Sequence, residues 1–191
     1  ELIETGFEVI CVDDLSNSDG SALHGIKAIT GKDVTFYNYD IGDTDKMQEV
    51  FDREGRIDGI IHFAAFKAVN ESVQFPLKYY VNNVAGLISL LQLALKNGCN
   101  RFLFSSSCSV YGDADRLPVS ESSPLGEIRS PYARTKLICE EILIDLASSG
   151  STMKSIALRY FNPAGAHPSN EIGESPTINA SNLVPVITET A

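Results

Sequence analysis

The sequence predicts an α/β protein in which a doubly wound parallel sheet is covered by helices on both faces. Short, nearly continuous apolar runs alternate along the chain with longer stretches whose apolar residues recur at helical spacing. Strands that are apolar throughout are buried on both faces, which is typical of parallel sheets with crossover helices. The chain has 191 residues, of which 43% are hydrophobic, and this is enough for the core of one such domain.

Five apolar runs are expected to form the strands, at residues 8–12, 34–37, 57–63, 101–105 and 155–159. Each run is short and is bounded by turn-forming residues, which favours a strand over a helix. In parallel sheets, ligands bind beyond the carboxyl ends of the strands. The residues there are mostly small or polar, and they are Asp13, Asp14, Asp40, Ile41, Phe63, Ala64, Ala65, Ser105, Ser106, Ser107, Tyr160, Phe161 and Asn162.

Three stretches between these runs carry a helical pattern, at residues 45–54, 76–97 and 131–146. Gly98 is expected to end the second helix, and Pro131 suits the first turn of the third, where no backbone N–H is needed. From about residue 163 the sequence becomes rich in Pro, Asn and Gly and is expected to be irregular. The predicted division is a nucleotide-binding domain over residues 1–162 and the beginning of a substrate-binding region over residues 163–191.

The composition argues against several classes of function. The net charge is −10 and the isoelectric point is near 4.7, which disfavours nucleic-acid binding because that binding depends on Lys and Arg neutralising phosphates. No apolar run reaches membrane-spanning length. The four cysteines are scattered without a metal-ligand spacing, so we expect reduced thiols in a cytoplasmic protein and no metal site.

Asp13 follows the first predicted strand, where a carboxylate can accept both hydroxyls of an adenosine ribose. It would also repel a 2′-phosphate, which favours NAD over NADP; an ordinary strand-end turn is the alternative. A glycine-rich phosphate loop should precede such an acid by roughly 20 residues. Only twelve residues precede Asp13, and the one glycine among them is Gly6. The loop and a first strand are therefore expected upstream of Glu1, with residues 1–7 as the tail of the following helix.

Tyr132 and Lys136 are four residues apart in the third predicted helix and therefore share a face. A buried ammonium beside a phenol is expected to lower the phenol pKa from about 10 toward neutrality, so that Tyr132 can accept a proton from a hydroxyl. Ser107 follows a buried strand, and its hydroxyl can bond the same substrate oxygen. Taken separately, a Tyr-x-x-x-Lys match arises by chance and a serine after a strand is commonly a turn residue.

Five segments in order, 62–72, 80–84, 105–112, 130–136 and 158–168, resemble the extended short-chain dehydrogenase/reductases, and among them the UDP-glucose 4-epimerases. The resemblance implies a Rossmann-like fold, NAD as cofactor, a UDP-sugar substrate, a role in galactose metabolism, and a homodimer paired through two long helices. It implies Ser107, Tyr132 and Lys136 as catalytic residues. It further implies cofactor-binding roles for Asp13, Asn17, Ser18, Asp40, Ile41, Phe63, Ala64, Lys67, Asn82, Tyr132, Lys136 and Tyr160, and substrate-binding roles for Ser107, Tyr132, Phe161, Asn162, Asn182 and Leu183.

Plainer interpretations of some of these residues stay open. Lys67 suits a pyrophosphate counter-charge but also a solvated lysine, Asn82 is also an ordinary polar residue of a helix, and the pair Asn182 and Leu183 is also an ordinary cap.

Two other functions also compete with an epimerase. A 4,6-dehydratase or decarboxylase on the same scaffold carries acidic residues just after the catalytic hydroxyl, where this chain has Cys108 and Ser109. A non-catalytic nucleotide-binding module would not need Ser107, Tyr132 and Lys136 together. Because the phosphate loop and the later part of the sugar site are expected outside residues 1–191, this stretch alone is expected to be inactive.

Overall fold

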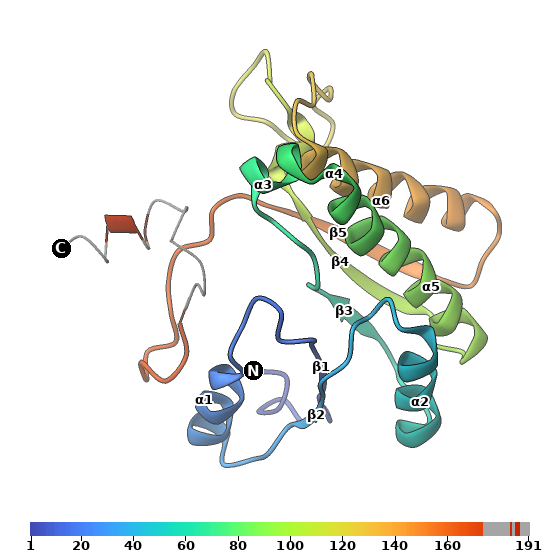
Figure 1. Cartoon of the computed structure of the whole chain (residues 1–191), viewed down its shortest axis with the longest axis vertical. Coiled ribbons are helices and arrows are strands. Elements are labelled where there is room, and N and C mark those ends of the chain that lie inside the picture. Colours follow the sequence, from blue (N-terminus) through green and yellow to red (C-terminus); the bar gives the residue numbers. More distant parts are fainter. Residues whose placement is uncertain (174–183, 185, 188–191) are drawn as a thin grey trace. The chain divides into compact units, whose positions relative to one another are not determined.

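The computed structural model describes residues 1–173, 184, 186 and 187, and its elements alternate strand with helix (Figure 1). Their order is β1 (Ile10–Val12), α1 (Ser21–Thr30), β2 (Thr35–Tyr37), α2 (Thr44–Glu54), β3 (Ile60–His62), α3 (Val69–Gln74), α4 (Pro76–Tyr79), η1 (Tyr80–Ala85), α5 (Gly86–Lys96), β4 (Arg101–Ser107), η2 (Cys108–Tyr111), α6 (Pro131–Ser148) and β5 (Lys154–Tyr160). The described strands pair only in parallel. The predicted α/β class with parallel strands is confirmed.

The chain forms two compact units. The first comprises Glu1–Asp40 and the described residues from Asn162 on, and the second comprises Ile41–Phe161. The predicted functional division after residue 162 stays a prediction.

In the first unit, β1 and β2 pair in parallel, with Cys11 opposite Phe36. Helix α1, which the sequence pattern did not predict, connects them between two glycines, Gly20 and Gly31, whose φ angles are 74° and 69°. Such positive φ values favour glycine. Gly25 of α1 is also required by space, because a Cβ there would lie 2.4 Å from the backbone oxygen of Glu171.

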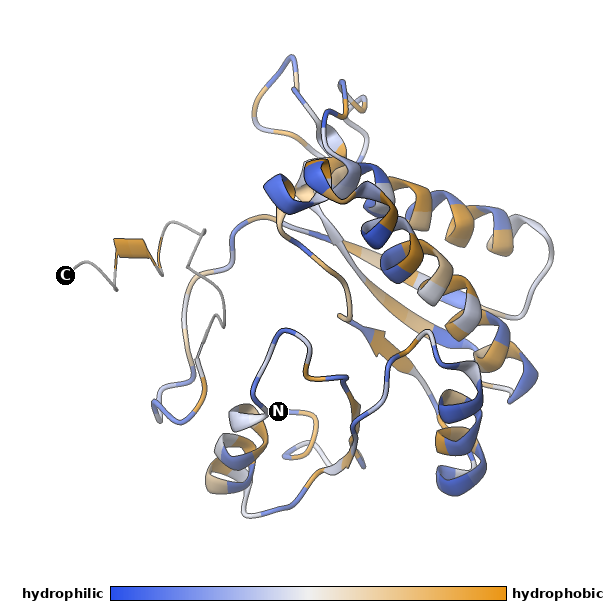
Figure 2. Cartoon of the chain, in the orientation of Figure 1, coloured by the Kyte–Doolittle hydropathy of each residue, from blue (hydrophilic) through white to orange (hydrophobic). Residues whose placement is uncertain are grey.

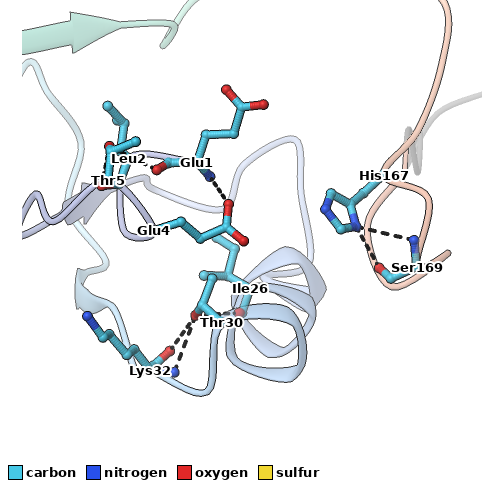
Figure 3. Close-up of polar contacts among 9 residues, drawn as sticks. All are labelled: Glu1, Leu2, Glu4, Thr5, Ile26, Thr30, Lys32, His167 and Ser169. Atoms are coloured by element: carbon cyan, nitrogen blue, oxygen red, sulfur yellow. Dashed lines mark hydrogen bonds and ion pairs between the residues drawn. The ribbon is translucent and has the colours of Figure 1, made fainter.

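Local hydrogen bonds shape the remaining segments of this unit (Figure 3). The hydroxyl of Thr5 donates to the carbonyls of Glu1 and Leu2 at 3.0 and 2.9 Å, and residues 2–6 form turns. The predicted helical tail is therefore a set of turns. Further along, the imidazole Nδ1 of His167 lies 2.8 Å from the Ser169 hydroxyl, which stabilises a second turn.

The second unit is a three-stranded parallel sheet in the order β3-β4-β5. Helix α6 packs on β4 and β5, and η1 packs beside α6 (Figure 1). Side chains alternate along β4: Phe102, Phe104 and Ser106 are buried, whereas Leu103 and Ser105 are half-buried. Figure 2 shows hydrophobic residues along β3 and in bands along α5 and α6.

Local signals explain where the two longest helices of this unit begin and end. Helix α5 ends in a Schellman motif, in which the N–H groups of Gly98 and Cys99 donate to Leu95 and Ala94. Helix α6 begins at Ser130, whose hydroxyl accepts from the N–H of Ala133 at 3.2 Å, and Pro131 occupies its first turn.

The single helix predicted over residues 76–97 is wrong in detail. The segment consists of α4, the π-helix η1 and α5, and the short helix α3 before it was not predicted. A π-helical turn releases backbone carbonyls from the ordinary ladder and is frequent at functional sites. Periodicity alone does not reveal it, because one inserted residue barely changes the apolar spacing.

Among the residues that the structure describes, no helix combines the length and the apolar composition needed to cross a membrane.

Candidate active site

Ser107 is the last residue of β4 and the cap of η2. Its hydroxyl oxygen accepts from the Ser109 hydroxyl at 2.9 Å and from the Ser109 N–H at 3.2 Å. The side chain therefore does serve a turn, as the plainer interpretation requires. Ser107 also acts on the pKa of Tyr132, which it lowers, so the two side chains lie near each other.

Helix α6 carries Tyr132 and Lys136 one turn apart on one face. Lys136 is 4% exposed. Its Nζ donates to the carbonyl oxygen of Ser105 at 2.7 Å and lies 5.0 Å from the ring centre of Phe104. The same Nζ lies 6.0 Å from the centre of the Tyr132 ring. The structure thus brings together the three residues that the sequence singled out: Ser107, Tyr132 and Lys136.

The electrostatics of this group differ from the expectation. Burial lowers the pKa of Lys136 to about 8. The pKa of Tyr132 is raised rather than lowered, because burial outweighs the effect of the nearby Ser107 hydroxyl, which favours the phenolate. The expected drop toward neutrality is therefore wrong for this structure. The ammonium is bonded to the Ser105 carbonyl and is not in direct contact with the phenol oxygen.

The carboxyl end of β3 contributes His62 and the segment that follows it. His62 is 4% exposed and lies against the rings of Phe102 and Phe104, and burial lowers its pKa to about 4. Phe63 is exposed and Ala64 half-buried, while Lys67 is exposed. All three of these predicted cofactor residues follow one strand end, as the sequence indicated.

Asn83 lies in the segment 80–84 that carries the resemblance, where it was expected to be an ordinary polar residue of a helix and was given no role in the site. It is 2% exposed in η1. Its amide oxygen accepts from the N–H of Phe66 at 2.9 Å, and its amide nitrogen donates to the Phe66 carbonyl at 3.0 Å and to the Thr135 hydroxyl at 3.1 Å. The predicted residue Asn82 is half-buried and donates to the Asn83 amide oxygen at 2.9 Å.

The π-helical turn explains a further contact between η1 and α6. The thiol of Cys139 donates to the backbone carbonyl of Asn83 at 3.3 Å, and Thr135 donates to the Tyr132 carbonyl at 2.7 Å. Asn83 therefore ties the segment after β3 to the helix that carries Tyr132. A buried asparagine inside an apolar helical pattern was the available signal, because burial of an amide requires several partners.

In the first unit, Asp13 directly follows β1. Its Oδ1 accepts from the N–H of Leu15 at 2.8 Å and from the Ser18 hydroxyl at 3.3 Å. The structure therefore places Ser18 beside Asp13, with Asn17 next to it in the chain. The Oδ1 atom of Asp13 therefore stabilises a turn, as the plainer interpretation expects. A role of Asp13 in binding the hydroxyls of a ribose stays a prediction.

The remaining predicted site residues differ in how far they are buried. Ile41 is 8% exposed and packs near Gly86, where a Cβ would lie 3.2 Å from its Cδ1. Asp40, Tyr160, Phe161 and Asn162 are exposed. Asn182 and Leu183 lie outside the described residues.

Residues 1–184 match the NAD dependent epimerase/dehydratase family. The chain belongs to this family. It is 48% identical over 191 residues to a UDP-glucose 4-epimerase of Dictyostelium discoideum and 46% identical to one of Bacillus subtilis. Both matches cover 100% of this chain but only 55% and 56% of the relatives, so the chain spans just over half their length.

Solved structures of family members agree in fold. The UDP-glucose 4-epimerase of Bifidobacterium longum, in complex with NAD+ and UDP, has a TM-score of 0.94 at 41% identity over 98% of this chain and 56% of its own. The enzyme of Stenotrophomonas maltophila, with NAD and formylated UDP-arabinopyranose, has a TM-score of 0.93 at 43% identity over 98% and 55%. The Rossmann-like class and the resemblance to these epimerases are confirmed.

Proposed function

We propose that this protein interconverts UDP-glucose and UDP-galactose through a transient NAD-dependent oxidation at C4 of the sugar. The observation that carries the proposal is the grouping of Ser107, Tyr132 and buried Lys136, since nucleotide binding alone requires none of them. The relatives support a UDP-sugar as the substrate, because the UDP-glucose 4-epimerases quoted above match along the whole chain. A place in galactose metabolism follows from that reaction.

The residues present fit NAD as the cofactor. Asp13 offers a carboxylate at the end of β1 that already accepts from N–H and O–H donors, as recognition of ribose hydroxyls requires. We assign the adenosine half to Asp13, Asn17, Ser18, Asp40 and Ile41, and the rest to Phe63, Ala64, Lys67, Asn82, Tyr132, Lys136 and Tyr160. When bound, NAD accepts a hydride from C4 of the sugar and later returns it.

Tyr132 is the base and acid of the proposed reaction. It removes the proton of the sugar 4-hydroxyl and later gives it back, while Ser107 donates a hydrogen bond to the same oxygen. Among the groups of this chain, Ser107 favours the phenolate, whereas burial raises the pKa of Tyr132 and opposes it. Phe161, Asn162, Asn182 and Leu183 are the proposed contacts of the UDP-sugar.

The rival activities make different demands on the residues after Ser107. Dehydration of a keto sugar needs a carboxylate near the reacting carbon, and the two following residues are Cys108 and Ser109, both in the turn at the end of β4. Neither side chain carries a carboxylate. This observation favours epimerisation over dehydration or decarboxylation.

The test is conversion of UDP-galactose to UDP-glucose by the purified protein at the full length of its relatives, with products separated by chromatography. Epimerisation that is lost in Tyr132→Phe and retained in Tyr80→Phe, a tyrosine outside the proposed site, supports the proposal. A 4-keto-6-deoxy sugar product would identify a dehydratase. Binding of the UDP-sugar without any conversion would identify a non-catalytic module.

We also propose that the protein is a homodimer and resides in the cytoplasm. Exposed apolar side chains follow one another along α4, η1 and α5, namely Leu77, Val81 and Ile88, and Ile144 is exposed on α6. Covering them with a second copy would remove this apolar surface from water. All four cysteines are free thiols, which suits a reducing compartment. Light scattering of the wild type and of Val81→Glu tests the dimer: a monomeric wild type would refute it.

A further inference from the structure

Glu140 of α6 is a carboxylate that the proposed reaction does not use, yet it is 5% exposed. Its Oε1 accepts from the Ser106 hydroxyl and from Nε of Arg159 at 3.0 Å. Its Oε2 accepts from Nε and Nη2 of Arg159 at 3.2 and 2.7 Å. Both carboxylate oxygens are therefore bonded, in the two-pronged geometry that arginine and carboxylate form best.

The partners of Glu140 stand directly before two residues of the proposed site. Ser106 precedes Ser107 on β4, and Arg159 precedes Tyr160 on β5. Ser106 and Arg159 are also opposite each other in the parallel pairing of the two strands. One carboxylate on the helix thus holds both strands at the point where they deliver their site residues.

Arg159 extends this contact to a fourth element. Its guanidinium lies 4.8 Å from the ring centre of Tyr111, in η2, and the hydrogen bond to Glu140 raises its pKa. Because η2 begins just after Ser107, the packing against Tyr111 fixes the turn that orients the Ser107 hydroxyl. Figure 1 shows α6 lying along β4 and β5, which is the arrangement that this contact spans.

On α6 itself, Glu140 is one turn beyond Lys136 and two turns beyond Tyr132. Residues at this spacing share a helix face. A shift of the helix along the sheet would therefore move Tyr132 and Lys136 together relative to Ser107. The four hydrogen bonds of Glu140 oppose that shift.

A contribution to folding stability does not by itself explain the buried ion pair of Glu140 and Arg159. Well-packed apolar residues often replace a buried ion pair with no loss of stability or with a gain. The best-attested role of buried ionic groups is to select one packing arrangement among several. In this unit, the arrangement selected is the register of α6 on β4 and β5.

We propose that Glu140, through Ser106 and Arg159, is a positioning residue that sets Tyr132 against Ser107 for the reaction. The inference rests on the proposed function for its catalytic consequence. The positioning itself is a property of the protein without substrate, and it has a readout of its own. That readout is the ionisation of the Tyr132 phenol, which the nearby Ser107 hydroxyl favours.

The test compares Glu140→Gln with Glu141→Gln, the exposed neighbour on the same helix. Phenolate formation is followed by ultraviolet absorbance against pH, and the Tyr132 contribution is isolated by subtracting the titration of Tyr132→Phe. We expect Glu140→Gln to move that titration to higher pH. We also expect kcat for UDP-galactose to fall about 10- to 100-fold, with KM changed less than about threefold. Glu141→Gln is expected to match the wild type in both.

A folded Glu140→Gln variant with an unchanged Tyr132 titration overturns the proposal, whether or not kcat falls. A fall in thermal stability with kcat unchanged also overturns it, because the role is then structural only. If Glu140→Gln does not fold, Arg159→Lys is tested in its place. Lysine keeps the positive charge but cannot form the paired hydrogen bonds that the guanidinium makes with a carboxylate. If the wild type at the full length of its relatives does not epimerise, but the titration is shifted in Glu140→Gln, the proposed function is refuted and the positioning of Tyr132 stays supported.

Discussion

Replacing Lys136 by methionine is expected to stabilise the fold near neutral pH while it removes catalysis. The ammonium of Lys136 is 4% exposed, and burial lowers its pKa from 10.5 to about 8. At 1.36 kcal/mol per pKa unit, holding the charged form in the folded state costs roughly 3 kcal/mol. Methionine fills a similar volume and carries no charge, so this cost disappears in the variant.

The hydrogen bond to Ser105 opposes this gain. Loss of the donor leaves the Ser105 carbonyl without its 2.7 Å partner, at a cost of about 1–3 kcal/mol. The net expectation is a stabilisation of about 1 kcal/mol at pH 7. The net effect is a small difference between the cost of the buried charge and the cost of the lost hydrogen bond. The pH dependence of the stability difference is therefore a sharper test than its sign at one pH.

That pH dependence has a definite direction. Between the folded pKa of about 8 and the unfolded value of 10.5, the unfolded wild type binds more protons than the folded wild type. Wild-type stability therefore rises with pH across this window relative to the variant. The stability of Lys136→Met relative to the wild type is highest below pH 8 and falls by roughly 3 kcal/mol by about pH 10.5, so the net advantage of about 1 kcal/mol becomes a deficit.

Burial lowers the pKa of His62 to about 4 and raises that of Cys139 from 9.0 to about 12, so both are neutral in the folded state across this window. The unfolded Cys139 thiol ionises within the window in the wild type and in the variant alike, so the difference between the two proteins reports Lys136. Urea unfolding of the wild type, Lys136→Met and the exposed control Lys154→Met, measured at several pH values, provides the assay. A stability difference between Lys136→Met and the wild type that does not change from pH 7 to 10.5 would refute the reasoning.

Three further predictions address the site and its support. In the protein at the full length of its relatives, Tyr132→Phe is expected to reduce epimerase turnover by several orders of magnitude while bound NAD is retained; near-normal rates would remove Tyr132 from the mechanism. Asp13→Ala is expected to weaken NAD far more than NADP in titrations, because its carboxylate favours free ribose hydroxyls, and equal losses would leave Asp13 as a turn residue only. Gly112→Ala is expected to destabilise the fold by at least about 1 kcal/mol, since φ is 57° and a Cβ would lie 2.5 Å from the Glu127 carbonyl; a melting temperature equal to the wild type would contradict that.

Sequence patterns carried much of the fold because the strands and helices of the second unit are strongly apolar and well punctuated. Gly98 and Pro131 marked their helix boundaries correctly, and all five predicted strands are present. Helix α1 was missed because its pattern includes His24 and Gly25, and the tertiary reason for Gly25 is a contact with Glu171 that lies far along the chain.

The residues of the candidate site also fall into those that the sequence reveals and those that only the packed structure reveals. Ser107, Tyr132 and Lys136 were found because a short spacing on one helix and a strand end are visible in sequence. Asn83 and Glu140 were not found, because their importance lies in partners 17 to 56 residues away in the chain. The pKa of Tyr132 was predicted in the wrong direction, because the extent of its burial is a property of the packed structure.

The central claim is that the sugar is oxidised and reduced again at C4 with the same hydrogen. The most direct measurement is turnover of UDP-galactose deuterated at C4 in ordinary water, with the UDP-glucose product examined by mass spectrometry and NMR. The proposed reaction predicts that the deuterium is retained at C4 of the product. Replacement of that deuterium by solvent hydrogen would contradict hydride transfer and, with it, the role assigned to Tyr132.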